Sequence, residues 1–312
     1  MRPSLAALGT TAAAALVLAV LPFGLSGYHQ ALAAQVATFF ISILGLNILT
    51  GYTGQISIGH GAFMAIGGYT TAVLSRDHHT DLVVTMVAAF FLCFLCGLLV
   101  GLPALRLSGV YLALATFALA VSVPQIPLKF SSYLGGSGGV QSAKTVSHLW
   151  LYAVSWSAAA VMFAVAWLVL RGRTGRAFRA IRDSEVAATS SGVALPVYKT
   201  LAFGISAAFA GVAGSLFVIG TNGFAQPSEF GVLLSLQILI GAAVAGLGSL
   251  WGVIVGAAFV GLLPTISSDV PVIGSSHGQD VVFGVIVIAV MLLLPTGFAG
   301  LLHRLARSRA RA

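Results

Sequence analysis

The feature that most constrains this chain is a series of long apolar segments without charged residues. One of them, residues 31–75, contains no Asp, Glu, Lys or Arg. Apolar runs near 20 residues are long enough to cross the ~30 Å hydrocarbon core of a bilayer as helices. Of the 312 residues, 58% are hydrophobic and 7% are charged, against roughly a quarter charged in soluble domains. We therefore predict an all-α, polytopic membrane helix bundle that forms one domain over residues 1–312.

About ten segments have the length and apolar character of membrane spans. They are residues 4–25, 31–50, 56–74, 82–102, 108–126, 149–170, 200–220, 232–247, 249–268 and 280–298. The count is eight to ten, because the short eighth span and the Gly-rich turn after it could instead form a re-entrant hairpin, if protein or a cavity covers the irregular backbone.

The basic residues predict the orientation of the chain. With both termini cytoplasmic, 12 of the 15 Lys and Arg lie inside, among them a basic tail at 299–312, as the positive-inside rule expects. The net charge of +8 then reflects membrane topology and gives no sign of nucleic-acid binding. The N-terminus resembles a secretory signal, but its apolar run of 22 residues exceeds the roughly 7–15 residues of signal-peptide cores. We expect a retained span, with cleavage as the alternative.

The stretch GYTGQISIGHGAF, residues 51–63, lies inside the uncharged region 31–75. As a single helix that region would be about 67 Å long, roughly twice the bilayer core, so the chain must turn within it. Glycines at 51, 54, 59 and 61 favour a helix break there. The break is either a simple turn at the cytoplasmic face or a place where free N–H groups hold the polar part of a substrate. The pathway or gate candidates are Gly54, Gln55, Ser57 and His60.

The remaining motifs argue against an enzyme, a metal site and an ion-driven carrier. All seven acidic residues fall in loops or at span ends, whereas ion-coupled carriers usually keep an ionisable group in the membrane. The chain has no phosphate-binding loop and no catalytic motif. Cys93 and Cys96 lie within one span without further metal ligands, so we expect them to be packing residues. Energy for uphill transport would have to come from another protein.

One cytoplasmic segment, residues 171–199, is large enough to receive a partner. Ala177, Ile181 and Ala188 recur at helical spacing beside Arg176, Arg179 and Arg182, a pattern that predicts a short basic amphipathic helix. Such a helix could lie on anionic lipid headgroups or dock into a groove of a soluble protein.

Small residues recur at four-residue spacing near the C-terminus, at Gly248, Gly252 and Gly256. Such faces let helix backbones approach closely in lipid. They are candidates for helix packing, within this chain or between two membrane chains, so homodimer and heterodimer both stay open.

Four stretches resemble the permease subunits of bacterial branched-chain amino acid ABC importers, the LivM type, between about residues 36 and 300. They begin at residues 51, 105, 175 and 241, and they read GYTGQISIGHGAFMAIGGYTTAVL, LRLSGVYLALATFA, GRAFRAIRDSEVAATSSGVALPVYKTLAFGISAAFAGVAGSLF and GAAVAGLGSLWGVIVGAAF. The sequence departs from the family pattern at TSSGVALP, where Ala194 replaces the usual Asn.

The resemblance implies a passive permease in a bacterial plasma membrane that translocates branched-chain or related neutral amino acids. It implies a second permease subunit, two cytoplasmic ATPases that bind ATP and Mg, and an extracytoplasmic substrate-binding protein, with no cofactor on this chain. Glu185 and Gly192 match the acidic residue and glycine of the family's ATPase-coupling loop, which makes residues 171–199 the expected coupling segment. Urea or short-chain amides are the nearest other substrates. A stand-alone facilitative or ion-coupled carrier is the alternative of a different class.

Overall fold

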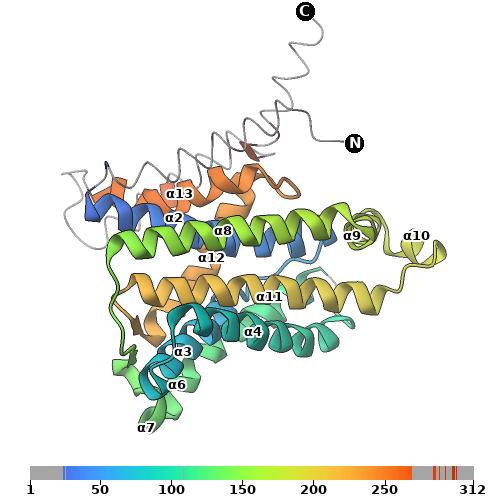
Figure 1. The fold of residues 1–312 in the computed structure, drawn as a ribbon. Coiled ribbons are helices and arrows are strands. Elements are labelled where there is room, and N and C mark those ends of the chain that lie inside the picture. Colours follow the sequence, from blue (N-terminus) through green and yellow to red (C-terminus); the bar gives the residue numbers. More distant parts are fainter. Residues whose placement is uncertain are drawn as a thin grey trace, which may run out of the picture.

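The computed structural model describes residues 24, 26–107 and 109–268, and the single residues 284, 285, 288, 292, 297, 298 and 300. The described part of the chain is an all-helical bundle with one very short strand pair (Figure 1). Its long helices are α2 (Gly27–Leu46), α3 (His60–His78), α4 (Leu82–Ala104), α5 (Val110–Ser122), α8 (His148–Arg171), α11 (Leu195–Gly220), α12 (Val232–Ala245) and α13 (Gly252–Ser268).

Shorter elements join these helices. A π-helical segment, η2 (Asn47–Tyr52), continues α2. After α5 come η3 (Val123–Gln125), α6 (Ile126–Lys129), α7 (Ser131–Leu134) and η4 (Gly136–Gly138); α9 (Arg173–Asp183) and α10 (Glu185–Ser190) precede α11, and η5 (Pro227–Phe230) precedes α12. Strands β1 (Val140–Gln141) and β2 (Phe224–Ala225) pair antiparallel, with Val140 opposite Ala225. This two-residue pair ties the loop before α8 to the loop after α11.

Six of the described helical segments are long and apolar enough to cross a membrane. They are Gly27–Tyr52, Leu82–Ala104, Val110–Lys129, His148–Arg171, Leu195–Gly220 and Pro227–Ala245. Helix α3, where the sequence predicts a span at 56–74, starts later and ends in the polar residues Arg76, Asp77 and His78. The spans predicted at 4–25 and 280–298 lie essentially outside the described residues. The count of about ten is therefore not confirmed.

The eighth and ninth segments form the packed helix pair α12 and α13. Helix α12 has 14 residues, about 21 Å at 1.5 Å per residue, so it falls short of the ~30 Å core. It reaches the length of a span only together with η5. A crossing and a re-entrant hairpin therefore both stay compatible with these lengths.

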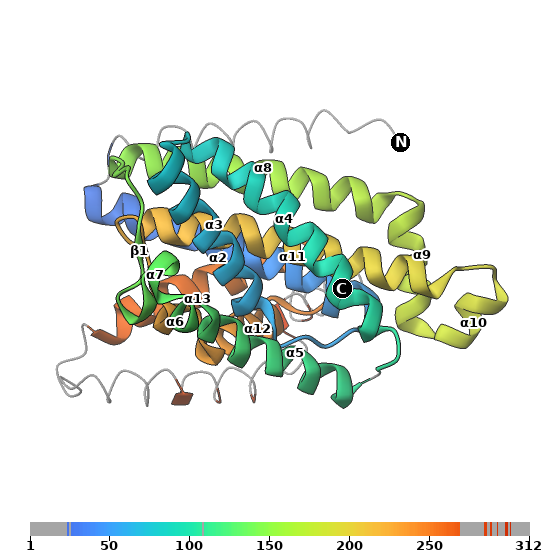
Figure 2. The same cartoon turned by 90° about the horizontal axis from the view of Figure 1, so that it is seen from below.

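Two helices form the centre of the bundle. Within their most apolar 18-residue windows, 83% of the Gly27–Tyr52 residues and 89% of the Leu195–Gly220 residues are buried, against 28% for α4 and α8. Helix α11 contacts α2, α3 and α4, while α2 also contacts α8 and α13. Figures 1 and 2 show α8 and α4 on the outside of this pair, with α9 following the end of α8 and α10 extending farthest from the bundle.

Helices α3 and α11 touch through their backbones because glycines face each other. A Cβ added at Gly67 would overlap the Gly211 carbonyl oxygen, and one at Gly214 would overlap the Met64 carbonyl oxygen. Cys93 of α4 packs against Gly211 and is buried. Close approach at small residues is how helices associate in lipid, where no hydrophobic force drives them together.

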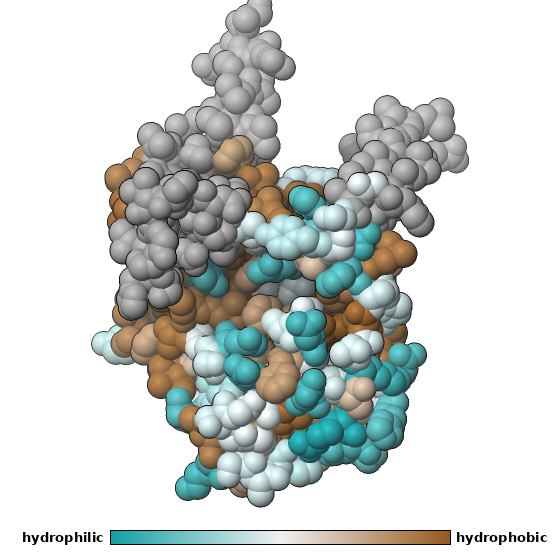
Figure 3. Space-filling view, turned by 90° about the vertical axis from the view of Figure 1, so that its left-hand side faces the viewer, coloured by the Kyte–Doolittle hydropathy of each residue, from teal (hydrophilic) through white to brown (hydrophobic). Residues whose placement is uncertain are grey.

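The surface separates polar ends from apolar sides. Figure 3 looks onto the end of the bundle where α2 and α8 begin, and hydrophilic side chains gather there between hydrophobic flanks. Along the sides, apolar side chains such as Leu99, Leu168 and Phe91 are exposed. This pattern is that of a protein with a bilayer around its middle.

Candidate functional site

The helix break predicted in residues 51–63 lies between α2 and α3. The helical path widens into η2, reverses at Gly54 with a φ of 74°, and runs without helical structure until α3 starts at His60. A φ in this left-handed range is accessible to glycine without steric cost. Gly54 is exposed, while Gln55, Ser57 and His60 are buried.

Side chains from other helices occupy the N–H groups of this break. The Ile58 N–H donates to Thr116 Oγ1 of α5 at 2.9 Å, and the Gly61 N–H donates to Ser235 Oγ of α12 at 2.9 Å. The Gly59 N–H donates to Ser57 Oγ at 3.3 Å. In this conformation, these three donors are therefore not free to hold a substrate, and the break is tied to α5 and α12.

His60 sits at the first position of α3 and is 1% exposed. Its Nε2 lies 3.1 Å from Ser206 Oγ of α11, and that hydroxyl donates to the Gly45 carbonyl of α2 at 2.8 Å. Because the serine proton is already used, Nε2 is assigned as the donor to Ser206. These two hydrogen bonds thus link α2, α3 and α11. Nδ1 of His60 is buried and has no hydrogen-bond partner in the described part of the chain.

Hydrogen bonds from the break cap the Leu49 carbonyl near the end of the α2–η2 helix. The Thr53 hydroxyl donates to the Leu49 carbonyl at 2.5 Å, the Gln55 N–H donates to the same oxygen at 3.3 Å, and the Thr50 hydroxyl donates to the Gln55 carbonyl at 3.0 Å. The Gln55 side chain donates to Thr53 Oγ1 at 2.9 Å. Gln55 therefore acts as part of a helix-end cap in this conformation.

Arg182, at the end of α9, closes the same helix end. Its Nη1 donates to the Gly51 carbonyl at 2.6 Å. A cation at a helix C-terminus is favoured by the partial negative charge of the unpaired carbonyl groups. Its guanidinium also packs on the turn between α12 and α13: a Cβ added at Gly248, whose φ is 85°, would lie 2.6 Å from Nη1.

Asn47 joins that turn to η2. Its side-chain amide accepts from the Gly248 N–H at 2.8 Å and donates to the Ser249 carbonyl at 2.9 Å. Asn47 is fully buried. We call the contact set of Asn47, Gly51, Arg182, Gly248 and Ser249 the junction. It brings the predicted cytoplasmic segment and both predicted glycine-rich breaks into direct contact.

The other predicted coupling residues lie on α9 and α10. Arg176 is exposed and Arg179 donates to the Leu170 carbonyl at 3.3 Å. Glu185 forms an ion pair with Lys199 at 2.7 Å, where the lysine side chain is 8% exposed and the glutamate 49%. Gly192 has a φ of 81° and ends α10 in a Schellman motif, in which the Val193 N–H donates to the Ala188 carbonyl at 3.0 Å.

The three glycines predicted to pack helices lie in two different settings. A Cβ at Gly252 would overlap the Ala245 carbonyl oxygen, and one at Gly256 would overlap the Gly241 carbonyl oxygen, so both lie where α13 meets α12. Gly248 lies in the turn and packs on Arg182 instead.

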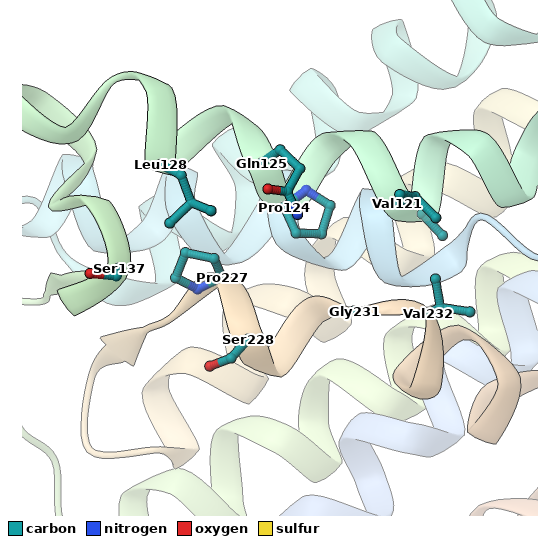
Figure 4. Close-up of a pocket in the computed structure, with 10 residues that line it drawn as sticks. Val121, Pro124, Gln125, Leu128, Ser137, Pro227, Ser228, Gly231 and Val232 are labelled. Atoms are coloured by element: carbon teal, nitrogen blue, oxygen red, sulfur yellow. The ribbon is translucent and has the colours of Figure 1, made fainter.

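A hollow of about 370 Å³ opens at the C-terminal end of α5 (Figure 4). Leu128 lies opposite Pro227 and Val121 lies opposite Val232, with Pro124 between them. The polar side chains that line the hollow are Gln125, Ser137 and Ser228. No charged residue lines it. Its chemistry suits a neutral molecule with an apolar part.

Several residues that build these contacts were not predicted. Asn47, Thr116, Ser206 and Ser235 are polar residues inside apolar spans, and all four are buried. Their position in such spans was the available signal, because polar groups within a membrane span are costly without partners.

Comparison with known proteins assigns the chain to a family. Residues 28–293 match the family described as branched-chain amino acid transport system / permease component. The permease protein LivM of the high-affinity branched-chain amino acid transport system of Escherichia coli is 32% identical over 276 residues, covering 78% of this chain and 65% of LivM. The corresponding LivH protein is 25% identical over 85% of this chain and 92% of LivH.

BraD of Pseudomonas aeruginosa is 31% identical over 140 residues, covering 45% of this chain and 44% of BraD. The chain thus matches slightly less than two thirds of LivM, and no solved structure matches it. A family match over residues 28–293 and LivM-like identity along an apolar helical bundle lead to one conclusion: the chain belongs to the branched-chain amino acid transport permease family.

Proposed function

We propose that this protein is the membrane permease subunit of an ATP-driven importer for branched-chain or related neutral amino acids. It acts with a second permease, two cytoplasmic ATPases that bind ATP and Mg, and an extracytoplasmic binding protein. The chain lies in a bacterial plasma membrane with both termini in the cytoplasm. The family, and relatives named for high-affinity branched-chain amino acid transport, support this proposal.

The single observation that carries the mechanism is the junction. Arg182 belongs to the segment expected to meet the ATPases, and it contacts both helix breaks, at Gly51 and at Gly248. A displacement of α9 therefore cannot leave the break between α2 and α3 unchanged. Coupling requires an element with two arrangements that both sites bias, and the break, held by replaceable hydrogen bonds, is such an element.

The surface that would meet an ATPase is α10. This helix extends past the bundle (Figures 1 and 2), and its Val186 is 78% exposed. An exposed valine beside polar residues, well separated from the apolar sides of the bundle, suits an apolar contact with a soluble protein. Glu185, also a coupling candidate, pairs with Lys199 and so holds α10 against α11.

The relatives' names and the hollow beside α5 support the proposed substrate class. That hollow has apolar walls and amide and hydroxyl groups without fixed charge, which suits a zwitterion with an aliphatic side chain. Urea and short-chain amides are smaller neutral alternatives. Competition for uptake between leucine and these amides, with a matched binding protein, separates the two classes.

The test of the proposal is uptake of labelled leucine into vesicles that contain the assembled complex. Val186→Glu places a charge in the proposed ATPase contact and should reduce ATP-dependent uptake by about tenfold or more, because hot-spot contacts contribute about 2 kcal/mol or more each. Ser132→Glu adds the same charge to exposed α7 and should leave uptake unchanged. Uptake that persists without ATPases would instead support a stand-alone carrier and refute the proposal.

A further inference from the structure

A second hollow of about 370 Å³ lies at the end of the bundle where α8 gives way to α9. Its lining includes Arg171, Arg179, Trp167 and Trp251, together with the phenol-bearing Tyr52. Gly248 and Ser249 of the junction complete one wall. Unlike the hollow beside α5, this one is strongly basic and aromatic.

The positive charge of this hollow is not neutralised by the described part of the chain. Its lining contains no Asp or Glu. The described ion pairs join Arg76 to Asp77 and Lys199 to Glu185, so neither Arg171 nor Arg179 is in one. Arg179 uses one donor on the Leu170 carbonyl, at 3.3 Å, which holds its guanidinium near the end of α8. Further N–H donors of both arginines stay available to an anion.

The tryptophans place the hollow at the membrane surface. Trp167 is 41% exposed and Trp251 is 67% exposed. The Arg171 guanidinium carbon lies 4.2 Å from the centre of the Trp167 ring, and the Trp251 ring lies 5.3 Å from that of Phe163 on α8. Exposed tryptophans are enriched where a helix leaves the hydrocarbon core for the headgroup region.

We propose that this hollow binds the phosphate headgroup of an anionic phospholipid. The two arginines supply charge and hydrogen-bond donors for the phosphate, and Tyr52 and Ser249 supply hydroxyl groups for the rest of the headgroup. The lipid's acyl chains run along α8, where Leu168 is 63% exposed. A free phosphate ion would make no use of the tryptophans or of the apolar surface of α8, so we assign the site to a lipid.

A lipid bound in this hollow would also contact the turn between α12 and α13. Ser249 accepts a hydrogen bond from the Asn47 side chain through its carbonyl oxygen, and Gly248 donates one to that side chain. A headgroup in the hollow therefore rests on the turn that fixes η2. The inference concerns lipid binding and does not depend on the transported substrate.

The test measures lipid binding to the purified full-length chain in mild detergent, by native mass spectrometry. The probes are short-chain phosphatidylglycerol and short-chain phosphatidylcholine. We expect phosphatidylglycerol to bind more tightly, and the double variant Arg171→Gln, Arg179→Gln to lose on the order of 30-fold of that affinity, since each basic residue near an anionic headgroup contributes about fivefold.

Two further variants keep the result interpretable. Arg173→Gln, Arg176→Gln removes the same charge from exposed positions of α9 outside the hollow and should retain binding. Arg171→Lys, Arg179→Lys preserves charge, so it should retain most of the affinity and shows that changing both positions does not unfold the protein. The proposal is overturned if both Gln pairs weaken binding equally, if neither does, or if millimolar inorganic phosphate displaces the lipid.

Discussion

Removing the Arg182 guanidinium should loosen the break between α2 and α3 without unfolding the protein. The change is Arg182→Gln, which keeps a polar side chain but cannot provide the cation that binds the Gly51 carbonyl at 2.6 Å. The rest of the break keeps its own hydrogen bonds, from Thr53 to Leu49 and from Ile58 to Thr116. We therefore expect local opening in place of global destabilisation.

The magnitude follows from the charged hydrogen bond that the variant cannot form. A hydrogen bond to a charged group contributes about 1.5–3 kcal/mol, and a cation at a helix C-terminus about 0.3–1 kcal/mol when exposed. Because Arg182 is exposed and both effects describe the same contact, we do not add them and take the lower end of the first range, about 1.5 kcal/mol. That value corresponds to a roughly tenfold larger population of the open break.

Hydrogen exchange measured by mass spectrometry reads this population directly. Peptides that cover residues 49–59 should exchange roughly tenfold faster in Arg182→Gln, while peptides of α11 stay unchanged. Gly248→Ala should act in the same direction, because its Cβ would lie 2.6 Å from Arg182 Nη1 and its φ is 85°. Arg176→Gln, on an exposed part of α9, is the matched control.

Unchanged exchange in both Arg182→Gln and Gly248→Ala would refute the reasoning, since it would mean that the junction does not hold the break closed. Faster exchange in Arg176→Gln as well would show a general effect of charge on α9. Neither result depends on the identity of the substrate, so this test stands apart from the uptake assay.

Three other changes test the packing and the ion pairs. Gly214→Leu should destabilise the bundle by about 3 kcal/mol or more, because its Cβ would overlap the Met64 carbonyl oxygen of α3. Gly220→Leu, at an exposed position where the Cβ would make an ordinary contact 3.8 Å from Leu151 Cδ2, should be tolerated in a thermal unfolding assay. Glu185→Ala should lower stability by about 1–2 kcal/mol by leaving Lys199 unpaired, and adding Lys199→Met should restore it. Hydrogen bonds from Arg76 and Tyr133 lower the pKa of Asp77 from 3.8 to about 2. The contribution of the Asp77 carboxylate to stability, present above about pH 4, should therefore disappear as the pH falls to about 2. Proteolysis of the loop that follows α6 should then increase with acid, and Asp77→Asn should remove that dependence.

The sequence predicted the break because length and charge leave no alternative. An uncharged region twice as long as a bilayer must turn, and glycines mark where. Sequence could not show that Thr116 and Ser235 occupy the N–H groups of the break, because these partners come from helices far along the chain. The three-dimensional arrangement decides which donors stay free.

The number of spans was less predictable than their positions. Hydropathy located α4, α8 and α11 to within several residues, but proline residues changed α5 into a composite segment that ends at Lys129. Helix α3 is long enough to cross a membrane, but its glycines and its polar last turn make it less apolar than the other long helices. Its length therefore favours a span and its composition does not. Six of the described helical segments are long and apolar enough to be spans, so the predicted count of about ten is not confirmed.

The coupling segment shows a further limit of pattern reasoning. Periodicity predicted an amphipathic helix, and α9 buries Ala177, Phe178 and Ile181. It could not show that Arg182 turns toward the bundle, because that direction depends on where the α2–η2 helix ends. Arg182, a coupling candidate, donates a hydrogen bond to the end of a membrane helix of its own subunit, and its coupling role stays a prediction.

The burial of α2 has a consequence for how the protein is made. This helix leaves the ribosome early, yet its packing partners α8, α11 and α13 follow much later in the chain. Until they arrive, Asn47 lacks the turn that it binds and Gly45 lacks the Ser206 hydroxyl. Nascent chains that stop before α11 therefore leave the Asn47 amide without these partners inside an apolar span, where an unpaired polar group is costly.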